Sequence, residues 1–234
     1  MKILVIALSG IGDALMFTPA LQLIKKQFPD SSIDAIVMYK GVKDIFSRTA
    51  LFNQIHYHDF LNSSKFSSLK FVLSLRKKFD ATINVYPSNR KEYNIISFLL
   101  GAKKRGAVKY LRSDFINLGF LNTHIVQEND SLHNVEENIR MSEKLFSTTF
   151  DSSPDLLFNI NLDDKLFAEK FLTERNIVST DLLIGFHPGC STLKNHTKRR
   201  WEPEKFSQLA QKLIDEKNAN IFVFGGPEEA ELKA

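Results

Sequence analysis

The sequence predicts an α/β protein, in which buried strands alternate with helices to form parallel sheets. The chain opens on a continuous apolar run, residues 2–8, which is typical of a strand covered on both faces. A glycine-containing turn follows, and then apolar residues at helical spacing. Because this order of strand and helix recurs along the chain, right-handed βαβ crossovers should place the strands side by side in a parallel sheet.

The elements of the first part of the chain follow in a regular order. Apolar residues at helical spacing between 17 and 28 predict a helix, with Thr18 as its N-cap and Pro19 as its first residue. Further strands are predicted over 33–38, 54–57, 81–86 and 103–108. Further helices are predicted over 42–48, 69–79, 89–100 and 129–146.

A polar stretch, residues 147–154, is rich in Ser, Thr and Asp and has little to bury, so we expect a linker there. The predicted domains are therefore 1–150 and 151–234. In the second domain we expect helices over 164–173 and 203–216, strands over 182–187 and 219–224, and a helix start over 228–233. A two-stranded sheet of this kind buries too little surface to be stable alone, so this domain either packs entirely on the first domain or is cut short, and we expect the latter.

The composition excludes several classes of protein. The chain has 234 residues, of which 43% are hydrophobic and 25% charged, and this is too apolar for a disordered chain. One cysteine cannot form a disulfide framework or a cysteine zinc site, and the six histidines show no metal-ligand spacing. We expect no metal site. The apolar runs are too short for a membrane span or a signal peptide, which predicts a cytoplasmic protein.

The turn after the first strand carries Gly10-Ile11-Gly12-Asp13, which resembles a dinucleotide fingerprint without its third glycine, because Leu15 stands there. Asp13 would also repel a pyrophosphate at a helix start. The glycines instead let the backbone turn sharply and project Asp13 beyond the carboxyl end of the strand. A carboxylate there could act as a general base on a hydroxyl, or it could simply cap a helical turn.

A second motif, His187 to Ser191, follows the buried strand predicted over 182–187. Four basic residues follow without an intervening acid, namely Lys194, Lys198, Arg199 and Arg200. Such a loop favours an anion site, because arginine grips phosphate oxygens in a bidentate fork, although a solvated basic loop is the alternative. Nucleic acid is a weaker interpretation, since the formal net charge is only +4 and the chain has one tryptophan.

A third motif, Phe224-Gly225-Gly226-Pro227, ends the last predicted strand and precedes Glu228 and Glu229. Acidic side chains at a helix start complement the helix dipole, so capping is a sufficient explanation. Alternatively, a carboxylate so placed could accept hydrogen bonds from ribose or sugar hydroxyls.

Seven short motifs, in a fixed order, carry a resemblance to a known family: Gly10-Ile11-Gly12-Asp13, Thr18-Pro19-Ala20-Leu21, Phe28-Pro29, His133-Asn134-Val135-Glu136, His187-Pro188-Gly189, Arg199-Arg200-Trp201 and Gly225-Gly226-Pro227. With them the chain resembles the bacterial glycosyltransferases typified by ADP-heptose:lipopolysaccharide heptosyltransferases, glycosyltransferase family 9. The resemblance covers essentially the whole chain, and the ordered set is more specific than any one motif.

The resemblance implies a GT-B architecture, with two Rossmann-like parallel-sheet domains and the C-terminal one truncated in this chain. Donor and acceptor would meet in the cleft between the domains. It implies an inverting, metal-independent transfer that needs no cofactor, because a nucleotide-diphosphate sugar such as ADP-heptose is a substrate. The catalytic base of the family maps onto Asp13.

The resemblance also implies the residues that bind each substrate. A phosphate-binding lysine of the family maps onto Arg199, with Lys198 adjacent, and a nucleotide-contacting glutamate maps onto Glu229, with Glu228 as the alternative. The expected donor-binding residues are His187, Gly189, Ser191, Lys198, Arg199, Gly226, Glu228 and Glu229. The expected acceptor-side residues are Gly10, Gly12, Arg90 and Lys91.

Two departures from the family pattern bear on activity. Members that act on the phosphorylated inner core carry a basic cluster after the third strand, whereas residues 58–65 here read HDFLNSSK, which predicts a different acceptor. A later donor-site motif of the family, an acid and a histidine at a helix start, would lie beyond residue 234. An incomplete donor pocket loses preorganised electrostatics, so we expect little or no transfer activity from this chain.

The predicted function is transfer of a heptose or related sugar to lipopolysaccharide or another lipid-linked envelope glycan, on the cytoplasmic face of the inner membrane. The basic stretch Lys103-Lys104-Arg105, with Lys109 and Arg112, could contact anionic headgroups or could be a solvated face. The alternative function is a non-catalytic nucleotide- or anion-binding module. An NAD-dependent oxidoreductase is disfavoured by Asp13 at the first glycine turn.

Overall fold

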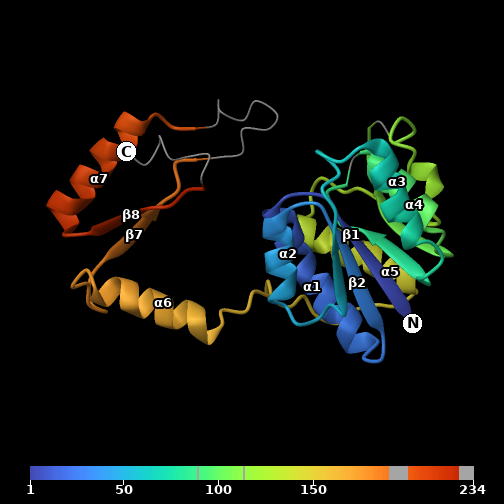
Figure 1. Ribbon diagram of the computed structural model, residues 1–234, viewed down its shortest axis with the longest axis horizontal. Coiled ribbons are helices and arrows are strands. Elements are labelled where there is room, and N and C mark those ends of the chain that lie inside the picture. The colour runs from blue at the N-terminus through green and yellow to red at the C-terminus, as the bar shows by residue number, and fades with distance from the viewer. Residues whose placement is uncertain (89, 113, 190–199, 227–234) are drawn as a thin grey trace. The chain divides into compact units, whose positions relative to one another are not determined.

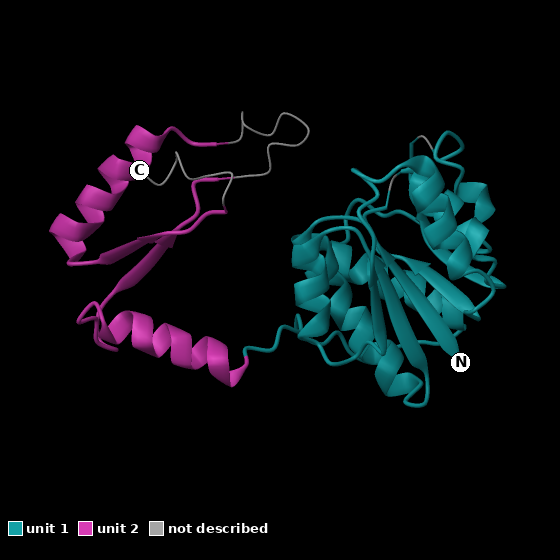
Figure 2. Ribbon diagram, in the orientation of Figure 1, with its two compact units in different colours: residues 1–160 teal, residues 161–234 magenta. Residues whose placement is uncertain are grey.

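The computed structural model describes residues 1–88, 90–112, 114–189 and 200–226 (Figure 1). The chain divides into two compact units, Met1–Ile160 and Asn161–Ala234 (Figure 2). In the described part of the chain, no helix is both long enough and apolar enough to cross a bilayer.

The first unit is built on a six-stranded parallel sheet with the order β3-β2-β1-β4-β5-β6. Its strands are β1 (Lys2–Ala7), β2 (Ser32–Val37), β3 (Gln54–Tyr57), β4 (Ala81–Asn84), β5 (Lys104–Lys109) and β6 (His124–Gln127). Its helices are α1 (Ile11–Gln27), α2 (Lys40–Ser47), α3 (Lys65–Ser74), α4 (Lys91–Leu100), α5 (Asn134–Phe146) and the short 3₁₀ helix η1 (Gly119–Leu121). The predicted parallel α/β class is confirmed.

Strand β1 is buried on both faces, and its residues alternate between two apolar cores. Ile3, Val5 and Ala7 pack in one core with residues of α1, α2 and α5. The alternate residues, Leu4 and Ile6, pack in a second core with residues of α3 and α4. Because successive side chains of a strand point to opposite faces, an unbroken apolar run is what a strand between two helical layers requires.

Helix α1 begins much earlier than we predicted. Gly10 is its N-cap, and Pro19 lies inside it. A proline in a helix removes one N–H donor, in this case the donor for the Leu15 carbonyl. The Thr18 hydroxyl donates to that carbonyl at 2.7 Å, so the carbonyl is satisfied. Interpreting Thr18-Pro19 as a helix start was therefore wrong.

The segment that leads out of the first unit is bound to it by hydrogen bonds. The Leu157 N–H donates to the Thr18 hydroxyl at 2.8 Å, and the Gln22 side-chain amide donates to the Asp155 carbonyl at 2.8 Å. The boundary between the compact units therefore falls at Ile160 rather than near residue 150, where the polar composition led us to place it.

The second unit contains one βαβ arrangement preceded by a helix. Its elements are α6 (Leu162–Thr173), β7 (Leu183–Phe186), α7 (Pro203–Lys217) and β8 (Asn220–Val223). Strands β7 and β8 pair in parallel, with Phe186 opposite Val223. Among its described residues only Pro188 and Ala219 are buried, so both helices and both strands expose apolar side chains.

The Thr18 hydroxyl both donates to α1 and accepts from Leu157, so its removal should be costly. We expect Thr18→Val to lower the free energy of unfolding by about 1–3 kcal/mol, because it leaves two backbone groups without a partner. Denaturant unfolding measures this change. Thr173→Val is the matched control, since that exposed hydroxyl only donates to the Glu169 carbonyl of its own helix. Equal losses in the two variants would contradict the role of Thr18.

Candidate functional site

The sheet order of the first unit defines where a ligand should bind. The chain runs from β1 outward to β2 and β3, and then returns so that β4 pairs with β1 on its other side. Open α/β sheets bind ligands outside the carboxyl ends of their strands at such a reversal of strand order. The candidate site of this unit is therefore the edge where β1 and β4 end.

Asp13 lies at this edge. It is in the first turn of α1, three residues after the N-cap Gly10, and its side chain is partly exposed. A helix N-terminus stabilises a nearby negative charge, because its first N–H groups point outward along the axis. Asp13 thus lies at the centre of the carboxyl edge, in the first turn of α1.

Two buried hydroxyl groups near this edge, of Ser9 and Tyr93, were not predicted from the sequence, and Tyr93 is close enough to Asp13 to feel its charge. The Tyr93 hydroxyl lies within hydrogen-bonding range of the Ser9 side chain and of the Leu8 backbone. Burial raises the pKa of Tyr93; the hydrogen bonds with Ser9 and Leu8 oppose this, the Asp13 charge raises the pKa slightly further, and the Arg90 charge lowers it. Tyr93 therefore stays protonated, and its hydroxyl remains a hydrogen-bond donor. No pattern in the sequence brings residue 93 next to residue 13.

Arg90 and Lys91, both predicted on the acceptor side, line a cavity of about 630 Å³ together with Tyr93. Apolar side chains of α3, α4 and the end of β1 form most of its wall, and Lys65 adds a third cation. The cavity therefore combines an apolar interior with three basic groups and one acid, Glu92. It adjoins the carboxyl edge through Tyr93, which belongs to both.

The loop between β3 and α3 also lines this cavity, through Phe60, Leu61 and Ser63. Its conformation is fixed by Asp59, whose carboxylate accepts from the backbone N–H groups of Leu61 and Asn62. The hydrogen bond from the Asn62 side chain is the main reason that the pKa of Asp59 lies below its usual value. The loop between β3 and α3 is thus a compact turn at the cavity wall, in the place where the family carries its basic cluster.

Gly10 and Gly12 do not form the sharp glycine turn that we expected. Gly10 has φ −72° and ψ 176°, an extended conformation open to any residue, and Gly12 is already helical. A Cβ atom at either position would meet nothing within 4 Å. What the two glycines provide is open space over the N-terminus of α1, next to Asp13.

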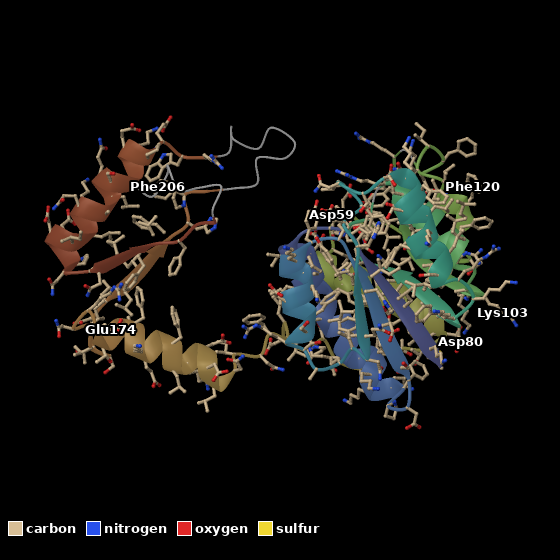
Figure 3. All side chains as sticks on the ribbon, in the orientation of Figure 1. Asp59, Asp80, Lys103, Phe120, Glu174 and Phe206 are labelled. Carbon is tan, nitrogen blue, oxygen red and sulfur yellow. The ribbon has the colours of Figure 1, made fainter. Side chains whose placement is uncertain are left out.

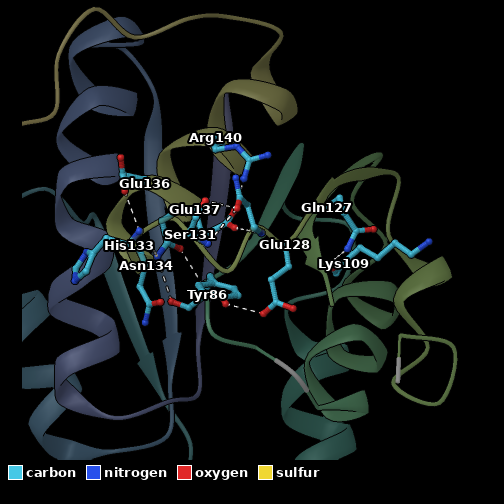
Figure 4. A network of polar contacts seen from close by, with 12 residues as sticks. Tyr86, Lys109, Gln127, Glu128, Ser131, His133, Asn134, Glu136, Glu137 and Arg140 are labelled. Carbon is cyan, nitrogen blue, oxygen red and sulfur yellow. Dashed lines mark hydrogen bonds and ion pairs between the residues drawn. The ribbon is translucent and has the colours of Figure 1, made fainter. Parts of the chain in front are cut away.

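A polar network at the start of α5 holds the end of β4 in place (Figure 4). The Asn138 side chain accepts from the Tyr86 N–H at 2.9 Å and donates to the Tyr86 carbonyl at 3.1 Å. The Tyr86 hydroxyl donates to Glu128 at 2.8 Å. This network fixes Tyr86, just after the end of β4.

His133 has a structural role in that network. The ring Nδ1 of His133 accepts from the backbone N–H of Val135 at 3.3 Å, and the backbone N–H of His133 donates to the Glu136 carboxylate at 2.8 Å. These bonds cap α5, which packs against α1 within the first unit. The motif that resembles an interdomain helix of the family therefore positions elements of the first unit.

In the second unit the two predicted donor loops start from the same edge. His187 and Gly189 follow β7, while Gly225 and Gly226 follow β8, the strand that pairs with β7. The Phe224 N–H donates to the Phe186 carbonyl at 2.7 Å, which extends the pairing to the point where both loops begin. This edge is again the carboxyl end of parallel strands.

Aromatic rings hold the far end of the basic loop at the same edge. Trp201 packs edge-on against Phe206 with ring centroids 5.2 Å apart, and Phe206 packs against Phe186 at 5.5 Å (Figure 3, which labels Phe206). Residues 187–189 and 200–201 are therefore both anchored at the end of β7. Five predicted donor residues, Ser191, Lys198, Arg199, Glu228 and Glu229, lie outside the described residues, as does the predicted helix over 228–233.

No group of three or more His, Cys, Asp or Glu side chains within residues 1–88, 90–112, 114–189 and 200–226 could hold a metal ion.

Two parallel-sheet units, each with candidate ligand groups at its carboxyl edge, define the class of protein as a GT-B type α/β protein. Comparisons with known proteins then give the family. A model of glycosyltransferase family 9 (heptosyltransferase) matches residues 68–234, and the chain belongs to this family. The resemblance inferred from the ordered motifs is confirmed. A search of curated proteins finds no match.

Solved structures share the fold over nearly the whole chain. A glycosyl transferase family 9 protein from Veillonella parvula is 22% identical, with a TM-score of 0.77 over 99% of this chain. E. coli ADP-heptose lps heptosyltransferase II is 20% identical with a TM-score of 0.73, and E. coli heptosyltransferase WaaC with ADP is 19% identical with a TM-score of 0.65, each over 99% of this chain. The chain spans 64%, 66% and 69% of the lengths of these three proteins.

The open space at Gly12 can be tested directly. Gly12→Ala should preserve the fold and raise the free energy of unfolding by up to about 1 kcal/mol, because alanine favours the helix and its Cβ meets no neighbour. If an acceptor hydroxyl approaches Asp13 through this space, the added methyl group should lower sugar transfer by about tenfold or more. Thermal unfolding and a transfer assay measure the two effects. Unchanged transfer would show that the space is not used.

Proposed function

We propose that the protein transfers a heptose, or a related sugar, from a nucleotide-diphosphate donor to a lipid-linked glycan of the cell envelope such as lipopolysaccharide. Membership of glycosyltransferase family 9 is the observation that carries this proposal. The residues at the two carboxyl edges support it, because one edge presents a carboxylate and the other begins a basic loop.

Asp13 is the proposed general base of an inverting, metal-independent reaction. Its carboxylate takes the proton from the acceptor hydroxyl while that oxygen forms a bond to the anomeric carbon of the donor sugar. The bond from this carbon to the diphosphate oxygen breaks, and the nucleoside diphosphate leaves with the electron pair. The family model covers residues 68–234, so this role of Asp13 is supported by its place at the sheet reversal and by its motif.

The proposed donor site is the carboxyl edge of β7 and β8. Lys198 and Arg199 would neutralise the charge of the leaving diphosphate. Gly189 and Gly226 would allow the backbone N–H groups of the protein to approach the phosphates. Glu229 or Glu228 would accept from the nucleotide hydroxyls. ADP is the proposed nucleotide, and the solved E. coli heptosyltransferase WaaC with ADP supports this choice.

The proposed acceptor side comprises Gly10, Gly12, Arg90 and Lys91. The last two line the cavity described above, where their charges would meet an anionic group of the acceptor. The protein would act on the cytoplasmic face of the inner membrane, because its acceptor is lipid-linked there.

Asp13→Asn tests the proposed base. It keeps the size of the side chain but cannot take the proton, so transfer should fall by about 10²–10⁴-fold, the usual contribution of a general base. Release of ADP from ADP-heptose measures transfer, and calorimetry should show ADP affinity unchanged. Transfer at the wild-type rate in Asp13→Asn would rule this role out. Because little or no transfer is expected from this chain, tight ADP binding without transfer would favour the non-catalytic module only in a chain that also carries the later donor-site motif of the family.

Arg199→Ala tests the proposed diphosphate site. Loss of a charge-assisted hydrogen bond to phosphate should weaken ADP binding by about tenfold or more in calorimetry. Arg112→Ala is the matched control, because it removes an exposed arginine from the first unit. If both variants bind ADP equally well, the assignment of the basic loop to the diphosphate is wrong.

A further inference from the structure

The crossover between β5 and β6, residues 110–123, turns large apolar side chains toward solvent. Parallel strands are usually joined by a helix that buries its apolar face, but among the described residues of this crossover, 110–112 and 114–123, the one helical element is η1. Four of its apolar residues are exposed, and so is one on the neighbouring helix α4. These five residues, here termed the apolar patch, are Phe98 (51% exposed), Leu111 (55%), Phe115 (81%), Ile116 (74%) and Phe120 (58%).

The inner side of the crossover is fixed by a buried amide network, so the patch cannot simply turn inward. The Asn94 side chain donates to the Asn117 carbonyl at 2.7 Å, and the Asn122 side chain donates to Asn94 at 2.7 Å. Both side chains belong to residues that are buried. On the outer side, the Phe115 and Phe120 rings lie 5.7 Å apart. The fold thus presents apolar groups outward on an anchored backbone.

Positive charge is concentrated in the same stretch of the chain as the apolar patch. Residues 98–120 contain five basic residues and one acid, Asp114, so their net charge equals the +4 of the entire chain. Arg105 has an internal role, because it donates to the Leu121 and Ala102 carbonyls and stacks near the Phe98 ring at 5.8 Å. Lys103, Lys104, Lys109 and Arg112 are exposed, and no ion pair involves them among the described residues.

We propose that this surface docks the protein on an anionic lipid bilayer. The apolar patch would insert among the headgroups, and the four exposed cations would contact lipid phosphates. Figure 3 shows Phe120 and Lys103 along the same side of the first unit. The charge surplus favours a lipid surface over another protein, since each Lys or Arg adjacent to an anionic membrane strengthens binding by about fivefold. An exposed apolar patch of this size marks a contact surface of some kind.

This proposal deepens the proposed function, because docking would bring the enzyme to a lipid-linked acceptor. It assigns the contact with the membrane to particular residues and divides the basic stretch into an internal Arg105 and four surface cations. It needs neither donor nor transfer, so it can fail or hold independently of the proposed reaction.

Vesicle flotation with the full chain tests the proposal. The chain should float with vesicles of phosphatidylcholine mixed with phosphatidylglycerol, and bind far less to phosphatidylcholine alone or in high salt. Phe115→Ser/Ile116→Ser should weaken binding to the mixed vesicles by about tenfold or more, because apolar area no longer leaves water. Lys103→Glu/Lys104→Glu should weaken it at least as much at low salt.

Each variant has a matched control elsewhere in the first unit. Phe158→Ser/Ile160→Ser removes the same two residue types from the segment bound to α1 and α2, on the other face of the sheet. Lys26→Glu/Lys43→Glu makes the same charge change on exposed positions of α1 and α2. Both controls should float like the wild-type chain, and circular dichroism verifies that all four variants are folded.

Several results would overturn the proposal. One is that the wild-type chain does not float with anionic vesicles, and another is that the controls lose binding as much as the patch variants. A third is that Phe115→Ser/Ile116→Ser abolishes self-association in analytical ultracentrifugation while vesicle binding is unchanged, in which case the patch joins two copies of the chain. ADP affinity, measured in parallel, should be the same in every variant.

Discussion

Burial of β1 on both faces is the constraint on which the candidate site depends. Its apolar run can be covered on both sides only at the centre of a sheet, between two layers of helices. A central first strand forces β2 and β4 to its two sides and so creates the reversal of strand order beside it. Asp13, six residues after the strand ends, therefore lies where this architecture leaves room for a ligand.

The glycines and the hydroxyl groups around β1 serve this placement in different ways. Gly10 and Gly12 leave the N-terminus of α1 open, and Ser9 and Tyr93 add buried hydroxyls near the same edge. Thr18 lets α1 continue through Pro19, so the helix can begin at the end of the strand instead of after the proline. The same hydroxyl accepts from Leu157 and ties the outgoing segment to this helix. Thr18 therefore supports the candidate site in two ways. It lets α1 begin at the end of β1, and it holds the segment around Leu157 against this helix.

The sequence allowed the parallel α/β class, most strands, the carboxyl-edge position of Asp13 and the family to be predicted. Periodicity and turn residues encode these features locally, and the ordered motifs encode the family. Strand β6 was missed because four residues after an irregular crossover give little periodicity. The contact of Tyr93 with the Asp13 region, the cavity at Arg90 and the exposure of Phe115 could not be predicted, since each depends on tertiary packing between distant segments.

We propose that a nucleoside diphosphate binds at the carboxyl edge of β7 and β8, and backbone amide chemical shifts, followed by NMR while ADP is added to the chain, measure this binding residue by residue. The largest changes are expected at Gly189, Gly225 and Gly226, at the ends of the two strands. Largest changes along the cavity between α3 and α4, with none at these glycines, would contradict it.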